Sequence, residues 1–163
     1  MLKAIVLGRD PRRTAIRAVA LVFVSAVVFG LVLRPVRAHG PSMAPTIGDG
    51  DLVFVNTLAY ALGRPVRPGD VVAIRLAGPN VFYLKRVVAL PYQRVAIDNG
   101  RLIVDGEPVE EPYVRHRAPW QYTEVSLGEH EFFVVGDNRG MRQDLHDFGR
   151  VSRERVKGKV VFW

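Results

Sequence analysis

The first side chain in this sequence with the setting of a nucleophile is Ser42. Pro41 precedes it and Pro45 follows three residues later, and prolines restrict the backbone around them, which predicts a stiff loop rather than a regular element. A serine nucleophile needs such a fixed position, because a displacement of ~1 Å can slow a reaction on the order of a hundredfold. Serines near prolines are also common in ordinary turns, so Ser42 alone does not establish catalysis.

A matching base is suggested by Lys85, which lies within the alternating run 81–90. The two-residue period of a strand places five residues of this run on one face: Val81, Tyr83, Lys85, Val87 and Ala89. Lys85 is then the one charge on an apolar face, where burial lowers its pKa and favours the neutral amine. A neutral lysine can accept the proton of a serine hydroxyl. The plainer alternative is an edge-strand lysine with its amine in water.

A third polar group is Gly136-Asp137-Asn138-Arg139, which follows the apolar run 131–135. Asp and Asn are typical turn residues, so this segment by itself predicts only the exit from a strand. Asp144, His146 and Asp147 lie a few residues downstream. Histidine is the commonest general base, so a set of Ser42, His146 and one of these aspartates is an alternative to the lysine.

Metal and thiol chemistry find little support in the sequence. The chain has no cysteine, which excludes disulfides, thiolate catalysis and zinc–thiolate sites. No two of its four histidines stand four residues apart, so a helical pair of histidine ligands is excluded as well. We therefore expect neither a metal nor an organic cofactor.

The net charge of +7 and the isoelectric point near 10.2 could indicate a nucleic-acid-binding protein. Most of that charge lies in residues 1–34, which contain one acid, Asp10, and six basic residues: Lys3, Arg9, Arg12, Arg13, Arg17 and Arg34. The rest of the chain carries too little excess charge for a basic binding face, so nucleic acid is not an expected partner.

The run Ala18–Leu33 is apolar apart from one serine and one glycine. Extended to residues 14–34 it is long enough to cross a bilayer, which needs about 20 residues. The basic residues in 1–13 predict a cytoplasmic N-terminus and place residues 38–163 outside the cytoplasm. A buried core helix is disfavoured because the run has no polar face. A cleavable signal peptide ending at Val36-Arg37-Ala38 remains an alternative, and it also implies export.

Residues 38–163 have the pattern of a single β domain. Alternating or continuous apolar runs predict strands at 51–56, 70–76, 81–90, 94–98, 101–105, 131–135 and 157–163. Asn99-Gly100 is a strong signal for a two-residue hairpin, and Asp105-Gly106 indicates a second turn that opens another short strand toward Glu111-Pro112-Tyr113. Short helical turns are expected at 59–62 and 152–156. The expected fold is mostly β, a coiled antiparallel sheet with few short helices, preceded by one transmembrane helix.

Four blocks of the sequence, taken in order, resemble type I signal peptidases. They are Ser42-Met43-x-Pro45-Thr46, Gly69-Asp70 before a strand, Tyr83-Leu84-Lys85-Arg86-Val87-Val88, and Gly136-Asp137-Asn138-Arg139. Each block is weak alone, but four in order behind a membrane anchor are a strong signal, and the resemblance covers about residues 38–163 and extends to the anchor. The resemblance implies a serine endopeptidase with a Ser/Lys dyad that removes signal peptides from exported preproteins after small residues of the Ala-x-Ala type. It implies a single-pass protein of the bacterial cytoplasmic (inner) membrane, whose partners are preproteins and the lipid bilayer.

The family's functional positions carry over as follows. Ser42 matches the nucleophile and Lys85 the general base, while Met43, Ile47, Tyr83 and Leu84 match residues around the pocket for alanine-like side chains. Arg86, Asp137 and Asp144 match a supporting charged cluster, and Asn138 belongs to the same block. Gly40 stands where some members carry an oxyanion-hole serine, which leaves backbone N–H groups, chiefly that of Ser42, for this role.

The chain departs from the family pattern in its last block. Arg142 replaces the serine that orients the lysine, and His146 replaces the usual arginine. An inward Arg142 would crowd the site, so we expect it to point outward.

Two other functions stay open: a specialised Ser/Lys processing peptidase of the conjugation type, and an inactive, membrane-tethered peptide-binding homologue. The sequence does not indicate the oligomeric state.

Overall fold

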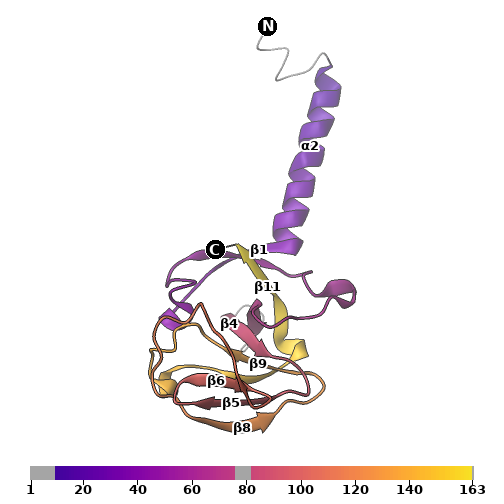
Figure 1. Cartoon of the computed structure of the whole chain (residues 1–163). Helices are drawn as coiled ribbons and strands as arrows, with labels where there is room; N and C mark the ends of the chain where they lie inside the picture. The colour runs from indigo at the N-terminus through magenta and orange to yellow at the C-terminus, as the bar shows by residue number, and fades with distance from the viewer. Residues whose placement is uncertain (1–9, 76–81, 163) are drawn as a thin grey trace.

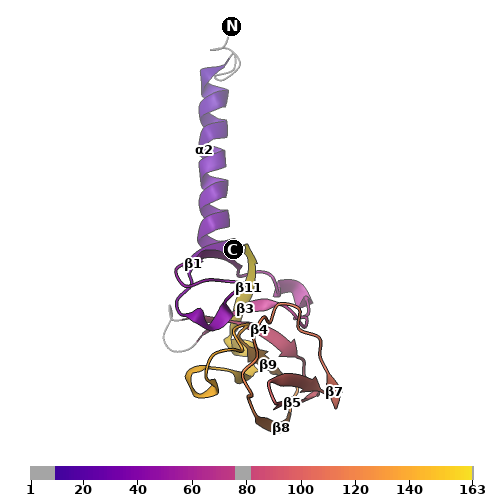
Figure 2. The same cartoon turned by 60° about the vertical axis from the view of Figure 1, so that its left-hand side comes forward.

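A computed structural model describes residues 10–75 and 82–162, and for Leu62 it describes the backbone alone. Within these residues a long helix projects from a domain built of strands, as both views show (Figures 1 and 2). Sequence predictions that involve residues 1–9, Leu76, Val81 and Trp163 lie outside the described residues.

The helix consists of α2 (Pro11–Val27) and a π-helical continuation, η1 (Val28–Val32). Asp10 caps its N-terminus by accepting a hydrogen bond from the Arg12 N–H at 3.0 Å. The most apolar 18-residue window of Pro11–Val32 has a mean hydropathy of 2.5, and none of it is buried. By length and composition it can cross a membrane. It begins at Pro11 rather than at residue 14 and ends before Arg34, which already belongs to the first strand.

Across the described residues the strands form two antiparallel sheets. The larger has seven strands in the order β1 (Leu33–Arg37), β2 (Leu52–Asn56), β11 (Val156–Phe162), β3 (Val71–Arg75), β4 (Phe82–Ala89), β9 (Glu131–Val135) and β10 (Gly149–Ser152). The smaller has four, in the order β7 (Glu107–Pro108), β6 (Arg101–Val104), β5 (Arg94–Asp98) and β8 (Tyr122–Ser126). Four 3-10 turns complete the domain: η2 (Pro41–Met43), η3 (Ala61–Gly63), η4 (Gln143–Leu145) and η5 (Arg153–Arg155). The mostly β fold class is confirmed.

Each strand predicted with a residue range matches an observed one to within a residue or two at its described ends, and the short strand expected after Asp105-Gly106 is β7. The Asn99-Gly100 turn has positive φ at both residues, 46° and 77°, as a type I′ hairpin requires. The sequence does not predict β1, β8 or β10. All three lie at sheet edges, where one neighbour is missing and the apolar alternation is weak.

The core falls into three clusters of buried side chains. One lies beneath the loop that carries Ser42 and joins Met43 and Ile47 to Val53, Val71 and Leu84. A second fills the space between the two sheets, and Trp120, only 2% exposed, lies there rather than at a membrane surface. A third covers the other face of the larger sheet around Val72, Val87 and Val134. The Ser42 loop is thus packed onto the core rather than free in solvent.

The C-terminal strand β11 determines how Ser42 and Lys85 are placed. The Ser42 loop joins β1 to β2, whereas Lys85 belongs to β4, and β11 and β3 stand between β2 and β4 in the sheet. Where β11 crosses β2, Gly158 is buried, and a Cβ there would approach the Asn56 carbonyl oxygen to 2.6 Å and Val55 Cγ1 to 2.7 Å. A glycine is therefore needed at this close approach of two backbones.

We expect Gly158→Ala to lower the free energy of unfolding by about 2 kcal/mol, because the added methyl must push β11 away from β2. Chemical denaturation in detergent measures the change. Gly128→Ala is the matched control, since its new Cβ would meet only the end of the Glu131 side chain at 3.5 Å. Equal stability of the two variants would contradict this account of β11.

Candidate active site

Ser42 lies in η2, a single 3-10 turn that begins after Gly40, which has a φ of 84°. The Asp49 carboxylate accepts a hydrogen bond from the Gly40 N–H at 2.8 Å and fixes the start of the turn. At its other side, the Ser42 carbonyl accepts from the Asn138 N–H at 3.0 Å, and the Asn138 side chain donates to the Pro41 carbonyl at 3.1 Å. The loop is thus held at both ends, and Ser42 itself is half-buried.

Lys85 is 2% exposed, and its Nζ lies 2.7 Å from Ser42 Oγ. Burial lowers the pKa of Lys85 to about 8, although the negative charges of Asp147 and Asp137 oppose this change. Ser42 Oγ is the one hydrogen-bond partner of this amine in the described part of the chain. The interpretation of Lys85 as a solvated edge lysine is therefore wrong, and the structure brings the two predicted residues into direct contact.

A small pocket of about 60 Å³ opens beside Ser42. All four residues predicted to surround an alanine-sized pocket line it: Met43, Ile47, Tyr83 and Leu84. Gly40 lines it too, from the segment that leads into the Ser42 turn. The cavity has room for a methyl-sized side chain.

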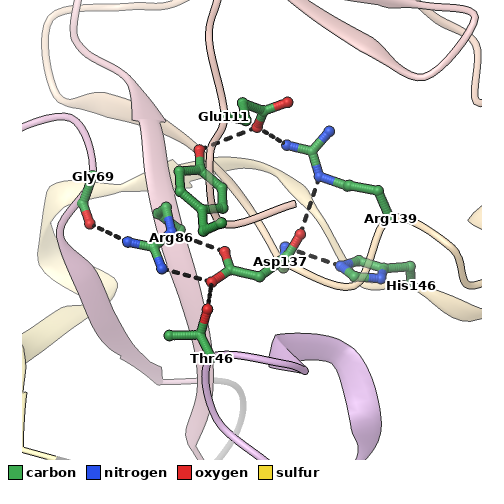
Figure 3. A network of polar contacts seen from close by, with 9 residues as sticks. Thr46, Gly69, Arg86, Glu111, Asp137, Arg139 and His146 are labelled. Carbon is green, nitrogen blue, oxygen red and sulfur yellow. Dashed lines mark hydrogen bonds and ion pairs between the residues drawn. The ribbon is translucent and has the colours of Figure 1, made fainter. Parts of the chain in front are cut away.

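Beside Lys85, the next residue of β4 forms a buried ion pair. Arg86 donates to both carboxylate oxygens of Asp137, at 2.8 and 2.6 Å, and to the Gly69 carbonyl at 2.7 Å (Figure 3). Thr46, in the Ser42 loop, donates to the same Asp137 carboxylate at 2.5 Å. Arg86 also stacks over the Tyr113 ring, 4.0 Å from its centroid. One carboxylate therefore connects β4, which carries Lys85, to the Ser42 loop.

A second buried pair, Glu111 and Arg139, continues this network. Arg139 donates to Glu111 and, through Nε, to the Gly136 carbonyl at 3.0 Å, while the Tyr113 hydroxyl donates to Glu111 at 3.1 Å (Figure 3). Burial raises the pKa of Glu111 against the opposing charge of Arg139. Sequence reasoning did not assign a role to Thr46, Glu111 or Arg139. Thr46 and Arg139 stand within the quoted family blocks, but no local pattern marks Glu111.

The prediction that Asp144 belongs to the supporting charged cluster is wrong. Its side chain is 60% exposed and forms a two-point pair with Arg142, at 3.1 and 2.6 Å, away from Arg86 and Asp137. Arg142 is itself 76% exposed, so it points outward as expected. The pair lies in the surface turn η4, and its two residues are only two positions apart in the chain, which favours a local contact with each other.

His146 is buried, and it does not contact Ser42 Oγ through a hydrogen bond. Its Nε2 accepts from the Gly136 N–H at 2.9 Å, so its proton resides on Nδ1, which lacks a hydrogen-bond partner among the described residues. The ring packs against Trp120 at 4.8 Å between centroids. Burial, aided by the charges of Lys85 and Arg139, lowers the pKa of His146 to about 3. This arrangement argues against the histidine-based catalytic set.

No group of three or more potential ligands from His, Asp and Glu is placed to hold a metal ion within residues 10–75 and 82–162. A hydroxyl nucleophile with an amine base could act here, because Ser42 and Lys85 are in contact. The buried charges around them, Arg86 with Asp137 and Arg139 with Glu111, are already paired with each other.

His146 makes stability depend on pH in a predictable direction. Its folded pKa of about 3 lies below the ordinary 6.5, so below pH 6.5 the unfolded chain binds a proton that the folded chain does not. Stability should therefore fall as the pH drops from 6.5 towards 3, with a slope of at most about 1.4 kcal/mol per pH unit from this group.

His146→Gln keeps an acceptor for the Gly136 N–H but cannot titrate, so it should flatten this part of the profile. The measurement is denaturant unfolding of both proteins between pH 4 and 8 in detergent. Parallel profiles would show that His146 is not held in its neutral form.

The chain is similar in sequence to bacterial signal peptidases. A family model described as "Signal peptidase, peptidase S26" matches residues 12–163. Signal peptidase I of Leptolyngbya laminosa is 31% identical over 153 residues, which cover 85% of this chain and 75% of that protein. Signal peptidase IB of Staphylococcus aureus strain Mu50 is 30% identical over 164 residues, which cover 89% and 85%.

Among solved structures, a signal peptidase I from Enterococcus faecalis V583 superposes with a TM-score of 0.49 at 23% identity, covering 60% of this chain and 98% of the other. The family match extends from the apolar helix through the last described strand, and it includes every residue of the Ser42–Lys85 site. The chain therefore belongs to the signal peptidase family, peptidase S26, and is a serine endopeptidase of that family.

Proposed function

We propose that this protein is a membrane-anchored signal peptidase that cleaves exported preproteins after small residues, with Ser42 as nucleophile and Lys85 as general base. The observation that carries the proposal is the 2.7 Å contact between Ser42 Oγ and the buried Lys85 amine. With a pKa of about 8, a substantial fraction of Lys85 is neutral near physiological pH. A neutral amine at this distance can accept the hydroxyl proton.

In the first step, Lys85 removes the Ser42 proton as Oγ attacks the carbonyl carbon before the cleaved bond. Ser42 stands in the first turn of η2, whose leading N–H groups lack acceptors within the helix, so its own N–H can hold the oxyanion. Protonated Lys85 then donates to the departing amine and an acyl-enzyme remains. Water, activated by the same neutral lysine, releases the signal peptide and restores the hydroxyl.

The sheet offers a place for an extended substrate beside the dyad. One edge of β4 pairs with β3 from Phe82 to Arg86, but on the other edge pairing with β9 begins only at Arg86. The unpaired edge of Phe82–Leu84 faces the pocket that residues 36–40 also line. A peptide could add here as a strand, and the small pocket would then select alanine-like side chains before the cleaved bond.

The anchor supports a location at the membrane. The basic residues Arg12, Arg13 and Arg17 begin the apolar helix, so the positive-inside rule places the N-terminus in the cytoplasm and the β domain outside. In a bacterium this means the cytoplasmic membrane, where signal peptides emerge beside the enzyme. No cofactor enters the proposed steps.

Ser42→Ala and Lys85→Met should each reduce kcat for a preprotein with an Ala-x-Ala site by at least about a thousandfold, because either change removes an essential member of the dyad. Cleavage in detergent micelles, followed by gel and mass spectrometry, measures this. Ser152→Ala is the matched control, since Ser152 makes no side-chain cap bond to η5. Loss of cleavage in His146→Gln together with full activity of Lys85→Met would overturn the choice of base.

The pH profile provides an independent test of Lys85. Since the neutral amine is the active form, kcat/KM should rise with pH through an apparent pKa near 8. Asp147 stabilises the ammonium, so Asp147→Asn should move this limb to lower pH. Glu129→Gln, which neutralises an exposed acid between β8 and β9, should leave the limb in place. If kcat/KM instead rose with pH near pH 6, and Asp147→Asn did not shift that rise, a lysine base would be contradicted.

A further inference from the structure

A large hollow in the described part of the chain has no role in the chemistry above. It is an open groove of about 920 Å³, a volume at the upper end of ordinary ligand sites. Its walls come from the start of β4, the loop before β8, the segment 142–148, β10 and η5. Segments far apart in the sequence thus converge on one cavity.

The groove is continuous with the active site. Tyr83 lines both this groove and the small pocket beside Ser42. The Lys85 amine lies 5.6 Å from the centre of the Tyr83 ring. Two further groove residues, His146 and Asp147, are close enough to Lys85 for their charges to interact. The dyad therefore stands between the small pocket and the groove.

The cleaved bond divides a substrate into an acyl half and an amine half. The position of Lys85, which donates the proton to the departing amine, indicates which cavity receives which half. The acyl half ends at the carbonyl that Ser42 attacks, and its last side chain enters the small pocket. The amine half must begin beside Lys85, because that lysine protonates the departing nitrogen. Beyond Lys85, the cavity that opens on the far side of Tyr83 is this groove.

We propose that the groove binds the first few residues of the mature protein, on the amine side of the cleaved bond, and that it favours acidic side chains there. This assignment rests on the proposed function. The small pocket would recognise the residue before the cleaved bond, and the groove would recognise the residues after it, which become the new N-terminus of the mature protein.

The lining residues fit a peptide of this kind. The half-buried rings of Tyr122 and Phe148 stack edge to face at 5.4 Å and give the groove an aromatic wall. Such rings bind peptide side chains with little loss of conformational entropy.

The groove is lined by three arginines and two aspartates, which gives it a small positive excess. Arg142 and Asp144 neutralise each other at hydrogen-bonding distance, whereas Arg150 reaches Glu131 only at 4.0 Å. Arg155 donates to the Arg75 carbonyl and has no carboxylate partner within the described residues. Asp147 is the one groove carboxylate outside an ion pair there. Because the Arg150–Glu131 pair is long and exposed and Arg155 donates only to a carbonyl, this small excess makes the groove moderately attractive to acidic residues.

Two preproteins test the proposal. They share one signal peptide and one Ala-x-Ala site, and they differ only at mature positions two to four, which are Asp in one and Lys in the other. The readout is the ratio of their kcat/KM values in low-salt detergent. Wild type should prefer the acidic substrate by about threefold, the range of exposed charge pairs, and high salt should reduce the preference.

Variants should move this ratio in opposite directions. Arg150→Glu should abolish or reverse the preference, and Asp147→Asn should increase it; any effect of Asp147→Asn on the Lys85 pKa cancels in the ratio. Arg64→Glu, an equal charge reversal at an exposed residue outside the groove, should match wild type.

Cleavage of both substrates with a ratio near one, or a preference that Arg150→Glu leaves unchanged, would overturn the groove assignment and leave the peptidase activity intact. Failure of folded wild type to cleave either substrate would instead overturn the proposed function, and the groove assignment with it.

Discussion

The buried carboxylate of Asp137 is the interaction on which the geometry of the site depends. It binds Arg86, which follows Lys85 in β4, and Thr46, which belongs to the Ser42 loop. Its neighbour Asn138 holds the Ser42 carbonyl from the same turn. Removing a carboxylate from such a place would leave a buried guanidinium uncompensated, which costs several kcal/mol. The turn after β9 therefore supports both Ser42 and Lys85, two residues from distant parts of the chain.

The second constraint is the control of charge around Lys85. Burial favours the neutral amine, but a nearby positive charge would lower its pKa further and a close acid would raise it. Two residues of the segment after β9, Arg142 and His146, both respect this balance. Arg142 is turned to solvent and paired with Asp144, and His146 is held neutral by its buried setting beside Gly136. Lys85 thus keeps a pKa of about 8, and Ser42 is its one hydrogen-bond partner among the described residues.

Glycine at position 136 shows how tightly these parts fit. A Cβ there would overlap the Ser42 carbonyl and lie 2.5 Å from His146 Nε2. The Ser42 loop, the turn after β9 and the His146 ring therefore meet at one point with no room for a side chain. This contact connects the network around Asp137 with the wall of the large groove, so the binding surface and the dyad share the same rigid support.

The sequence alone determined the apolar helix, the mostly β class, most of the strands and the Ser42–Lys85 pair. These depend on local properties: length and hydropathy for the helix, two-residue alternation for the strands, and ordered motif blocks for the pair.

Only the tertiary structure decided the partners of the buried charges. Glu111 and Arg139 lie 28 residues apart and meet because the smaller sheet folds against the larger one. Asp144 was expected beside Arg86 and instead pairs on the surface, because Arg142 lies two residues away. Edge strands and ion pairs depend on which segments lie side by side, and a linear pattern does not contain that information.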